Sequence, residues 1–316
     1  MPIHSSIALP LILLLAVALI AYVGACAFLY RSLFLPRRSA WLDDFLFTPW
    51  EFQADYEDVE LETADGVHFG AWFFRQLGSP QTIVVSPGHK GQRQAVLGIC
   101  VLLWRKGFNV VTYSYRGMPG SDRRRVTLGI DEVNELQAAI AFARRRVKGA
   151  RIGLLGYSMG AVVSLLGGAG EPSIEAFVLD SPFSDLGKLL RENIARLAHL
   201  PGRPIVAAVD MLLRLTSGHR LAEASPLAVL SALEPRPLFF IHGGADAVTG
   251  VHHSRLLYYN YRGPREIRIV QGDPHPGAYF ADRELYVERV AAFFGRHLGL
   301  NRANQLRLIE DEDQVS

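Results

Sequence analysis

Residues 156–160, with the sequence GYSMG, constrain the fold of this chain most strongly. They follow an apolar run at 151–155 that is typical of a strand and precede small and apolar residues at 161–166 that are typical of a helix. A serine between two glycines in such a unit indicates a nucleophile elbow, a strained turn that exposes the serine hydroxyl. The same pattern alone also fits an ordinary turn in a chain with 29 glycines, so the interpretation depends on other residues.

Two downstream residues supply the chemistry that a catalytic serine requires. A serine hydroxyl becomes a strong nucleophile when an imidazole accepts its proton, and a carboxylate must orient that imidazole. Asp246 follows the apolar run 237–241, and His275 follows the next predicted strand at 265–270. Because the carboxyl ends of parallel strands meet at one edge of a sheet, we expect Asp246 and His275 to lie beside Ser158.

The sequence also contains the parts of an oxyanion hole, in which two backbone amides bind the negative oxygen formed during acyl transfer. The amide of Met159, directly after Ser158, supplies the first. The predicted strand 82–85 runs into a Ser-Pro-Gly-His-Lys-Gly loop at residues 86–91, and the amide of His89 is the candidate for the second. This role does not require the side chain of His89.

Further motifs extend across the chain from Thr48 to about Leu298. Together with the order Ser158, Asp246, His275, they make the chain similar to the α/β-hydrolase superfamily. It resembles in particular small membrane-anchored members described as serine-aminopeptidase-like or dipeptidyl-aminopeptidase-like hydrolases. The motifs are residues 56–59, 63–66, 115–121, 180–183 and 236–243.

The resemblance leaves two features of the site open. Pro87 stands where the family usually has the histidine of a His-Gly pair, which bears on the shape of the oxyanion loop. Asp180 also ends a predicted strand, and some α/β-hydrolases carry the catalytic acid there. We favour Asp246 because its loop directly precedes the strand that leads to His275, whereas the Ser-Pro-Phe sequence after Asp180 indicates a turn-capping carboxylate.

Strand and helix patterns alternate along the catalytic part of the chain. This alternation, preceded by a hairpin at Asp65-Gly66, predicts a mostly parallel eight-stranded sheet with helices on both faces. The resemblance implies that this sheet has the α/β-hydrolase fold. Residues 186–235 lack strand patterns and contain two helical ones, so we expect a small helical lid there. The apolar strands are expected near 82–86, 108–113, 151–156, 174–179, 237–241 and 265–270, and the helices near 92–106, 129–146, 160–168 and 282–298.

Residues 7–30 contain no charged side chain and are long enough for a helix to cross a bilayer. A cleaved signal peptide is the alternative, but no Lys or Arg precedes the run and the run is long, which favours an uncleaved anchor. A lipoprotein cleavage site at Cys26 is a further alternative. Arg31, Arg37 and Arg38 follow the run, so the positive-inside rule predicts a cytoplasmic catalytic domain, with an extracytoplasmic one as the alternative.

We therefore divide the chain into an anchor with its linker at 1–40, a catalytic domain at 41–300 and an acidic, disordered tail at 301–316. Because every catalytic candidate lies beyond Thr48, we expect a protein that begins near Trp41 to fold and to hydrolyse short soluble esters. In this interpretation the anchor acts only by concentrating the enzyme at a lipid surface.

Composition excludes several other classes of function. The formal net charge of +2 does not indicate nucleic-acid binding, and the two cysteines, Cys26 and Cys100, do not indicate a fold held by disulfides. No cluster of histidine, cysteine and carboxylate residues has metal-ligand spacing, and no nucleotide-binding glycine motif follows a strand, so we expect neither a metal nor a cofactor. We expect His242 to be a packed structural residue, and His252 and His253 to lie at the surface.

These features predict a serine hydrolase that cleaves carboxylic ester or thioester bonds through an acyl-enzyme. Its expected partners are a small-molecule or lipid acyl substrate and the membrane that holds its N-terminal helix. A serine peptidase or aminopeptidase is the alternative, because the family resemblance includes such enzymes. A non-catalytic interaction protein on the same fold is the third hypothesis. The lid sequence contains no motif that identifies the acyl chain.

Overall fold

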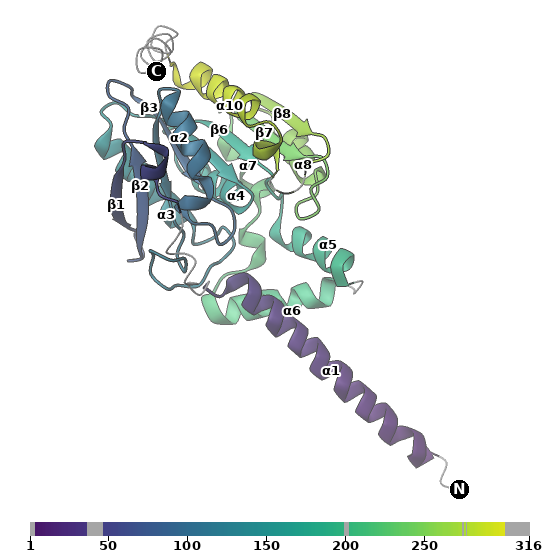
Figure 1. Ribbon diagram of the computed structural model, residues 1–316. Coiled ribbons are helices and arrows are strands. Elements are labelled where there is room, and N and C mark those ends of the chain that lie inside the picture. The colour runs from purple at the N-terminus through teal and green to yellow at the C-terminus, as the bar shows by residue number, and fades with distance from the viewer. Residues whose placement is uncertain (1–3, 37–46, 199–201, 274, 276, 301–316) are drawn as a thin grey trace.

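The computed structural model describes residues 4–36, 47–198, 202–273, 275 and 277–300 of the 316-residue chain (Figure 1). Residues 37–40 of the predicted linker, which include Arg37 and Arg38, and the acidic tail from residue 301 lie outside these residues. The described part contains an open sheet with helices on both faces, two lid helices and a long N-terminal helix that projects away from the sheet (Figure 1).

Eight strands form the sheet in the order β1-β2-β4-β3-β5-β6-β7-β8. Strand β2 is antiparallel to its neighbours, and the strands from β4 to β8 are parallel. The central strands are almost fully buried, as expected for parallel strands that are covered on both faces. The predicted α/β-hydrolase sheet is therefore confirmed. The strands are β1 (Glu57–Glu62), β2 (His68–Phe74), β3 (Gln81–Ser86), β4 (Asn109–Tyr113), β5 (Arg151–Tyr157), β6 (Ile174–Asp180), β7 (Leu238–Gly243) and β8 (Arg265–Val270).

Helices cover both faces of the sheet, and each face has its own apolar core. Helices α2 and α10 pack on one face, and α3, α4, α7 and α8 pack on the other. Helix α10 has well-defined ends, because the Asp282 carboxylate accepts a hydrogen bond from the Leu285 amide and Gly299 adopts a left-handed conformation. The bounds are α2 (Leu97–Arg105), α3 (Val133–Arg146), α4 (Met159–Ala169), α7 (Pro226–Leu233), α8 (His252–Asn260), α9 (Ala278–Ala281) and α10 (Arg283–Leu298), with short 3₁₀ helices at Pro49–Phe52, Arg93–Val96 and Leu221–Glu223.

Two helices, α5 (Leu186–Ala198) and α6 (Gly202–Ser217), form the lid beyond the carboxyl end of β6 (Figure 1). Leu186, Leu190 and Ile194 recur every four residues along α5, so one face of this helix is apolar and buried. The predicted lid range of 186–235 also includes α7, but α7 packs against α4 and α8 within the helical layer. The lid is therefore smaller than predicted.

The N-terminal helix α1 (His4–Phe34) contains one span that is long and apolar enough to cross a membrane, Ile12–Phe34. A signal sequence near an N-terminus is apolar enough to meet the same criterion. The N-terminal part of α1 projects away from the sheet, whereas its C-terminal part lies across α6 (Figure 1). Near that end, Tyr30 and Phe34 are buried against the rest of the protein.

Candidate active site

The structure places Ser158 at a tight turn between β5 and α4. Its φ of 52° and ψ of −115° are unfavourable for a residue with a side chain, as expected for a nucleophile elbow. A Cβ atom at Gly156 would lie 2.3 Å from the carbonyl oxygen of Gly160, and one at Gly160 would lie 2.3 Å from the carbonyl oxygen of Ser86. Only glycine fits at either position, because β5, α4 and the loop after β3 approach one another here.

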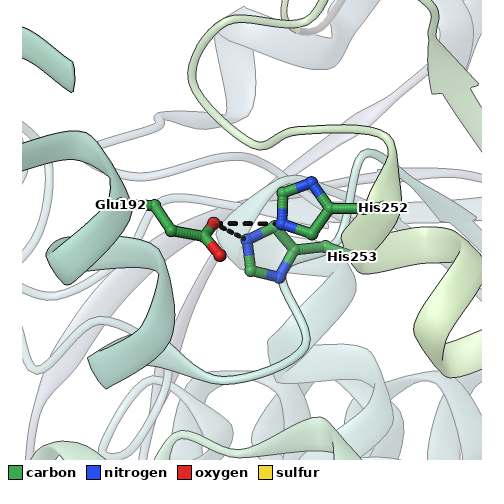
Figure 2. Close-up of side chains that lie close together, drawn as sticks. All are labelled: Glu192, His252 and His253. Atoms are coloured by element: carbon green, nitrogen blue, oxygen red, sulfur yellow. Dashed lines mark hydrogen bonds and ion pairs between the residues drawn. The ribbon is translucent and has the colours of Figure 1, made fainter. Parts of the chain in front are cut away.

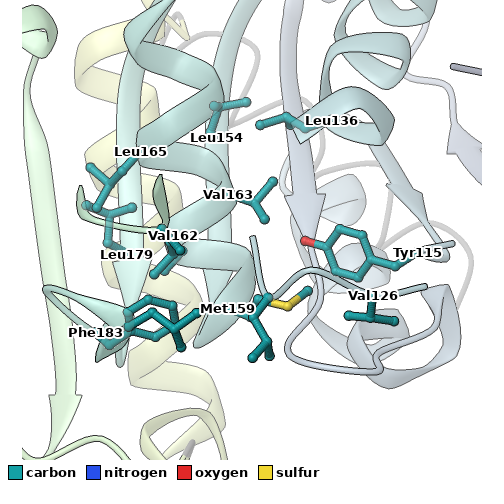
Figure 3. Packing of buried hydrophobic residues seen from close by; sticks show 14 of the residues in the cluster. Tyr115, Val126, Leu136, Leu154, Met159, Val162, Val163, Leu165, Leu179 and Phe183 are labelled. Atoms are coloured by element: carbon teal, nitrogen blue, oxygen red, sulfur yellow. The ribbon is translucent and has the colours of Figure 1, made fainter. Parts of the chain in front are cut away.

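Apolar packing beneath the turn holds the elbow in place. Met159, Val162 and Val163 on α4 are buried in the same core cluster as Leu154 of β5 and Leu179 of β6 (Figure 3). Because the core is close-packed on both sides of the turn, the strained conformation of Ser158 is supported by the surrounding structure.

The structure brings Ser158, His275 and Asp246 together in one line of hydrogen bonds. The Nε2 atom of His275 lies 2.8 Å from the Oγ atom of Ser158, and its Nδ1 atom lies 2.5 Å from Oδ2 of Asp246. Since a carboxylate only accepts, Nδ1 carries the hydrogen and Nε2 is free to accept the serine proton. This is the arrangement of a nucleophile, a general base and an orienting acid.

The surroundings of Asp246 keep it charged. Burial alone would raise its pKa, but hydrogen bonds from His242 and His275 and from the backbone amide of Thr249 outweigh that effect and hold its pKa well below the usual value. Its other oxygen accepts hydrogen bonds from the amides of Val248 and Thr249 at 2.8 and 2.7 Å. His242 is a buried residue that also donates from Nε2 to the Thr249 carbonyl, so its packing role agrees with the sequence-based expectation.

Asp180, the alternative acid, has other partners. Its carboxylate accepts hydrogen bonds from the hydroxyls of Ser181 and Tyr286, each at 2.9 Å, and it is fully buried. Burial raises the pKa of Asp180 to about 6 in spite of those hydrogen bonds. The main-chain carbonyl of Asp180 accepts a hydrogen bond from the Ser158 amide at 2.7 Å, so this residue supports the elbow through its backbone.

The predicted oxyanion loop lies against the elbow. A Cβ atom at Gly88 would lie 3.7 Å from the Cβ atom of Ser158, so the loop that carries His89 passes directly beside the serine. Met159 is the first residue of α4, so its amide has no partner within the helix and lies at the positive end of the helix dipole. The substitution of Pro87 for the usual histidine leaves this close approach intact.

The side chain of His89 is a polar group in an apolar setting. Burial, with a smaller contribution from the charge of Lys90, lowers the pKa of His89 to about 4, so the ring is neutral at physiological pH. Its Nδ1 atom is buried and has no hydrogen-bond partner among the residues that the structure describes. A polar group of a bound substrate would supply the missing hydrogen bond.

A cavity of about 490 Å³ opens above Ser158. Among its lining residues we define the floor as His89, Ser158, Met159 and Thr249. We define the roof as the lining residues on α1, α5 and α6, namely Ala25, Phe28, Leu29, Leu33, Leu186, Leu189, Leu190, Asn193, Ile194, Leu197 and Ile205. No charged side chain is among the lining residues that the structure describes, and the cavity has the size and apolar character typical of a small-ligand site.

One side of the lid is tied to α8 by three polar residues, Glu192, His252 and His253 (Figure 2). Their potential ligand atoms lie within 4.8 Å of one another, which is close enough to consider a metal. The Ser184 amide, however, donates to Nδ1 of His253, so the neutral ring carries its hydrogen on Nε2 and donates it to Glu192 at 3.0 Å. The geometry fits a tether between α5 and α8 better than a metal site.

The expectation that both of these histidines lie at the surface is half correct. His252 is exposed, but His253 is fully buried. Burial is also the main reason that the pKa of His253 falls to about 4. The error arises because helix α5 covers His253, and nothing in the local sequence of α8 indicates that contact.

Sequence reasoning missed the residues that shape the roof. The α5 residues were predictable as a class, because Leu186, Leu190 and Ile194 form a regular apolar stripe. The α1 residues, such as Leu29 and Leu33, were not, because an apolar side chain that faces lipid and one that faces a pocket have the same sequence pattern. No local pattern distinguishes the two.

Comparisons with known proteins agree with this architecture. A family model described as serine aminopeptidase, S33, matches residues 79–210. The chain is 28% identical to the uncharacterized protein YqkD of Bacillus subtilis, covering 74% of this chain and 77% of that protein. It is also 28% identical to the uncharacterized protein YfhR of Escherichia coli K12, covering 79% and 84%.

Solved structures show the same fold. The esterase Pf2001 of Pyrococcus furiosus superposes with a TM-score of 0.69 at 25% identity, covering 84% of this chain and 98% of that one. The α/β-hydrolase GrgF from Penicillium superposes with a TM-score of 0.64 at 21% identity, covering 78% and 100%. The chain therefore belongs to the α/β-hydrolase superfamily and is an enzyme of the hydrolase type.

Proposed function

We propose that the protein is a serine hydrolase that cleaves carboxylic ester or thioester bonds of acyl substrates. The observation that carries the proposal is the line of hydrogen bonds that leads from Ser158, at the floor of an apolar cavity, through His275 to Asp246. Its catalytic elements follow the chain order and geometry by which serine hydrolases activate the nucleophile.

In the proposed mechanism, His275 Nε2 accepts the Ser158 proton while Oγ attacks the acyl carbonyl carbon. The amides of Met159 and His89 hold the negative oxygen of the tetrahedral intermediate. His275 then gives the proton to the alcohol or thiol leaving group, which departs and leaves an acyl-serine. Water attacks this ester with His275 as the base, and its products are the carboxylic acid and free Ser158.

The lining of the cavity favours an acyl ester over an aminopeptidase substrate. An aminopeptidase must bind the charged α-amino group of a peptide, and a cation in an apolar pocket requires an acidic partner. The lining residues within the described part of the chain include no acidic side chain, and the Asp246 carboxylate is already occupied by His275 and backbone amides. Aliphatic and aromatic walls suit an acyl chain.

We also propose that α1 is retained as a membrane anchor with the catalytic domain in the cytoplasm. The burial of Tyr30 and Phe34 against the catalytic domain supports retention, because a signal peptide separates from its domain after cleavage. Support for the orientation comes from Arg31, together with Arg37 and Arg38 outside the described residues, after an apolar run with no preceding Lys or Arg. Reporter fusions at the C-terminus test the orientation, and an extracytoplasmic signal from such a fusion would contradict it.

A two-part assay tests the proposed reaction. The full-length protein is labelled with a fluorophosphonate, which reacts with activated serines, and is then tested on p-nitrophenyl esters, acyl thioesters and aminoacyl amides. We expect labelling at Ser158 and turnover of esters or thioesters. Faster turnover of the aminoacyl amides than of every ester would instead support the peptidase alternative, and no label with no turnover would support a non-catalytic role.

A further inference from the structure

The membrane helix α1 contributes four of the side chains that line the cavity above Ser158. They are Ala25, Phe28, Leu29 and Leu33, and they lie on the last turns of the candidate span. Leu29 and Leu33 are partly buried, whereas Phe28 lines the cavity and is 74% exposed, from which we infer that it lies at the mouth. The same helix is therefore both an apolar membrane segment and a wall of the candidate site.

Contacts along the C-terminal half of α1 fix this wall in place. The Tyr30 hydroxyl lies 2.6 Å from Thr216 Oγ1, and the Tyr22 hydroxyl donates to the Pro204 carbonyl at 2.9 Å, both on α6. At the end of the helix, the Phe34 carbonyl accepts a hydrogen bond from the Val126 amide at 3.0 Å, and the Phe34 ring is fully buried. Because these contacts bind α1 to the lid and to the domain, α1 is an integral part of the cavity.

The position of the wall along α1 coincides with the membrane boundary. The hydrocarbon core of a bilayer takes about 20 helical residues, so a span that begins at Ile12 leaves it near Arg31. Arg31 marks the polar side of that boundary. The cavity-lining segment from Ala25 to Leu33 then lies at the interface.

The lid presents exposed apolar side chains next to this segment. Met211 and Leu215 on α6 are 53% and 74% exposed, and Leu197 on α5 is 70% exposed although it also lines the cavity. Exposed apolar side chains beside a membrane span are suited to contact with lipid. An acyl chain can therefore extend from the bilayer to Ser158 along a continuous apolar surface.

We propose that α1 is part of the substrate-binding site, and that the substrate is a membrane-resident long-chain acyl ester whose chain enters along α1 between Phe28 and the lid. The proposal rests on the proposed function, because it names the substrate class of the same site. It revises the expectation for a protein that begins near Trp41, which would lack the α1 wall and would lose preference for long chains.

Two neighbouring positions on α1 provide a matched test. Ala25 lines the cavity, whereas a side chain at Gly24 would meet no atom within 4 Å. Full-length Ala25→Trp and Gly24→Trp proteins in lipid vesicles are each labelled with an ethyl and a hexadecyl fluorophosphonate. The measured quantity is the ratio of the hexadecyl rate to the ethyl rate, and labelling by the ethyl probe also reports a folded site.

We expect Ala25→Trp to lower this ratio about tenfold, the effect of displacing about two methylene groups from apolar contact. Gly24→Trp should keep the wild-type ratio. Phe28→Ala, which truncates an exposed side chain at the mouth, should lower the ratio by a smaller factor and covers the case in which Ala25→Trp fails to fold.

Equal ratios in Ala25→Trp, Gly24→Trp, Phe28→Ala and wild type would overturn the assignment of α1 to the binding site. Equal losses in the two tryptophan variants would overturn it as well, because they would reflect a general disturbance of the helix. Failure of both probes to label the wild-type protein would overturn the proposed function itself, and this proposal with it.

Discussion

The floor and the roof of the cavity are held by different forces. At the floor, directional hydrogen bonds connect Ser158 to His275 and through it to Asp246, on loops at the edge of a buried parallel sheet. The roof consists almost entirely of apolar side chains on three helices, with Asn193 as its polar member. Directional bonds fix atoms to fractions of an ångström, whereas apolar contacts specify mainly volume and shape.

This difference suggests separate roles for the floor, where the proposed reaction takes place, and the roof, which contacts the rest of the substrate. On the proposed function, the floor performs one kind of chemistry on many acyl groups, because it contacts only the reacting atoms. The roof would then determine which acyl groups reach the floor, and it can be changed by substitution without rebuilding the floor. Substitutions at the floor should therefore alter turnover by orders of magnitude, whereas those at the roof should alter substrate preference.

The largest expected effect is at the nucleophile. Ser158→Ala should lower kcat by about 10⁶-fold and remove fluorophosphonate labelling, because no other atom in the line of hydrogen bonds can attack the substrate. Thermal unfolding and circular dichroism of the variant should match the wild type. Persistent labelling of a folded Ser158→Ala protein would mean that the floor has been assigned wrongly.

The second prediction separates two carboxylates at the same sheet edge. Asp246→Asn should lower kcat by about 10⁴-fold, because an amide no longer holds His275 in the required tautomer. Asp180→Asn is the matched control, since the Asp180 carboxylate bonds to Ser181 and Tyr286, and it should keep most of the activity. A reversed outcome would exchange the roles of the two residues.

The third prediction concerns the pH dependence of stability. Burial raises the pKa of Asp180 from 3.8 to about 6, so the folded state binds this proton more tightly than the unfolded state does. Its contribution is then fully present below about pH 4 and is lost as the pH rises through 6, at a cost of about 3 kcal/mol.

The difference in Tm between Asp180→Asn and wild type separates this contribution from that of the other titrating groups. Between pH 5 and pH 8 the Tm of Asp180→Asn should rise relative to wild type by several degrees. A difference that stays constant over this range would show that Asp180 does not titrate in the folded protein.

The smallest effect is expected at the tether between the lid and α8. Glu192→Gln keeps an oxygen that can accept from His253 Nε2. It removes the partly exposed ion pair of Glu192 with Lys188, and such pairs contribute about 0–1 kcal/mol, so Tm and kcat/KM should change little. Glu192→Ala leaves a buried His253 donor without a partner and should cost about 1–3 kcal/mol. If both variants were equally destabilised, charge rather than hydrogen bonding would hold the lid.

The elbow and the sheet were predictable from the sequence because their requirements are local. Gly156, Ser158 and Gly160 sit in a strand-turn-helix unit whose geometry leaves little choice of residue. The positions of Asp246 and His275 followed from one topological rule, that parallel strands end at the same edge. Their hydrogen bonding at 2.5 and 2.8 Å agrees with that expectation, whereas their catalytic roles stay predictions.

The arrangement of the roof could not be predicted in the same way. Phe34 and Tyr30 continue an apolar run whose sequence fits a lipid environment equally well, and only the fold reveals that protein surrounds them. The burial of His253 likewise depends on α5, some sixty residues away in the chain. Such contacts arise from shape complementarity between surfaces that are distant in the sequence, and they produce no periodic sequence pattern.

The burial of Phe34 at the end of α1 also has a consequence for processing. If a protease removed α1, the triad would remain, but the cavity would lose one wall and open to water. On the proposed substrate assignment, the product would be a soluble esterase for short chains instead of a lipid hydrolase. Cleavage of α1 would therefore change the substrate range of the enzyme as well as its location.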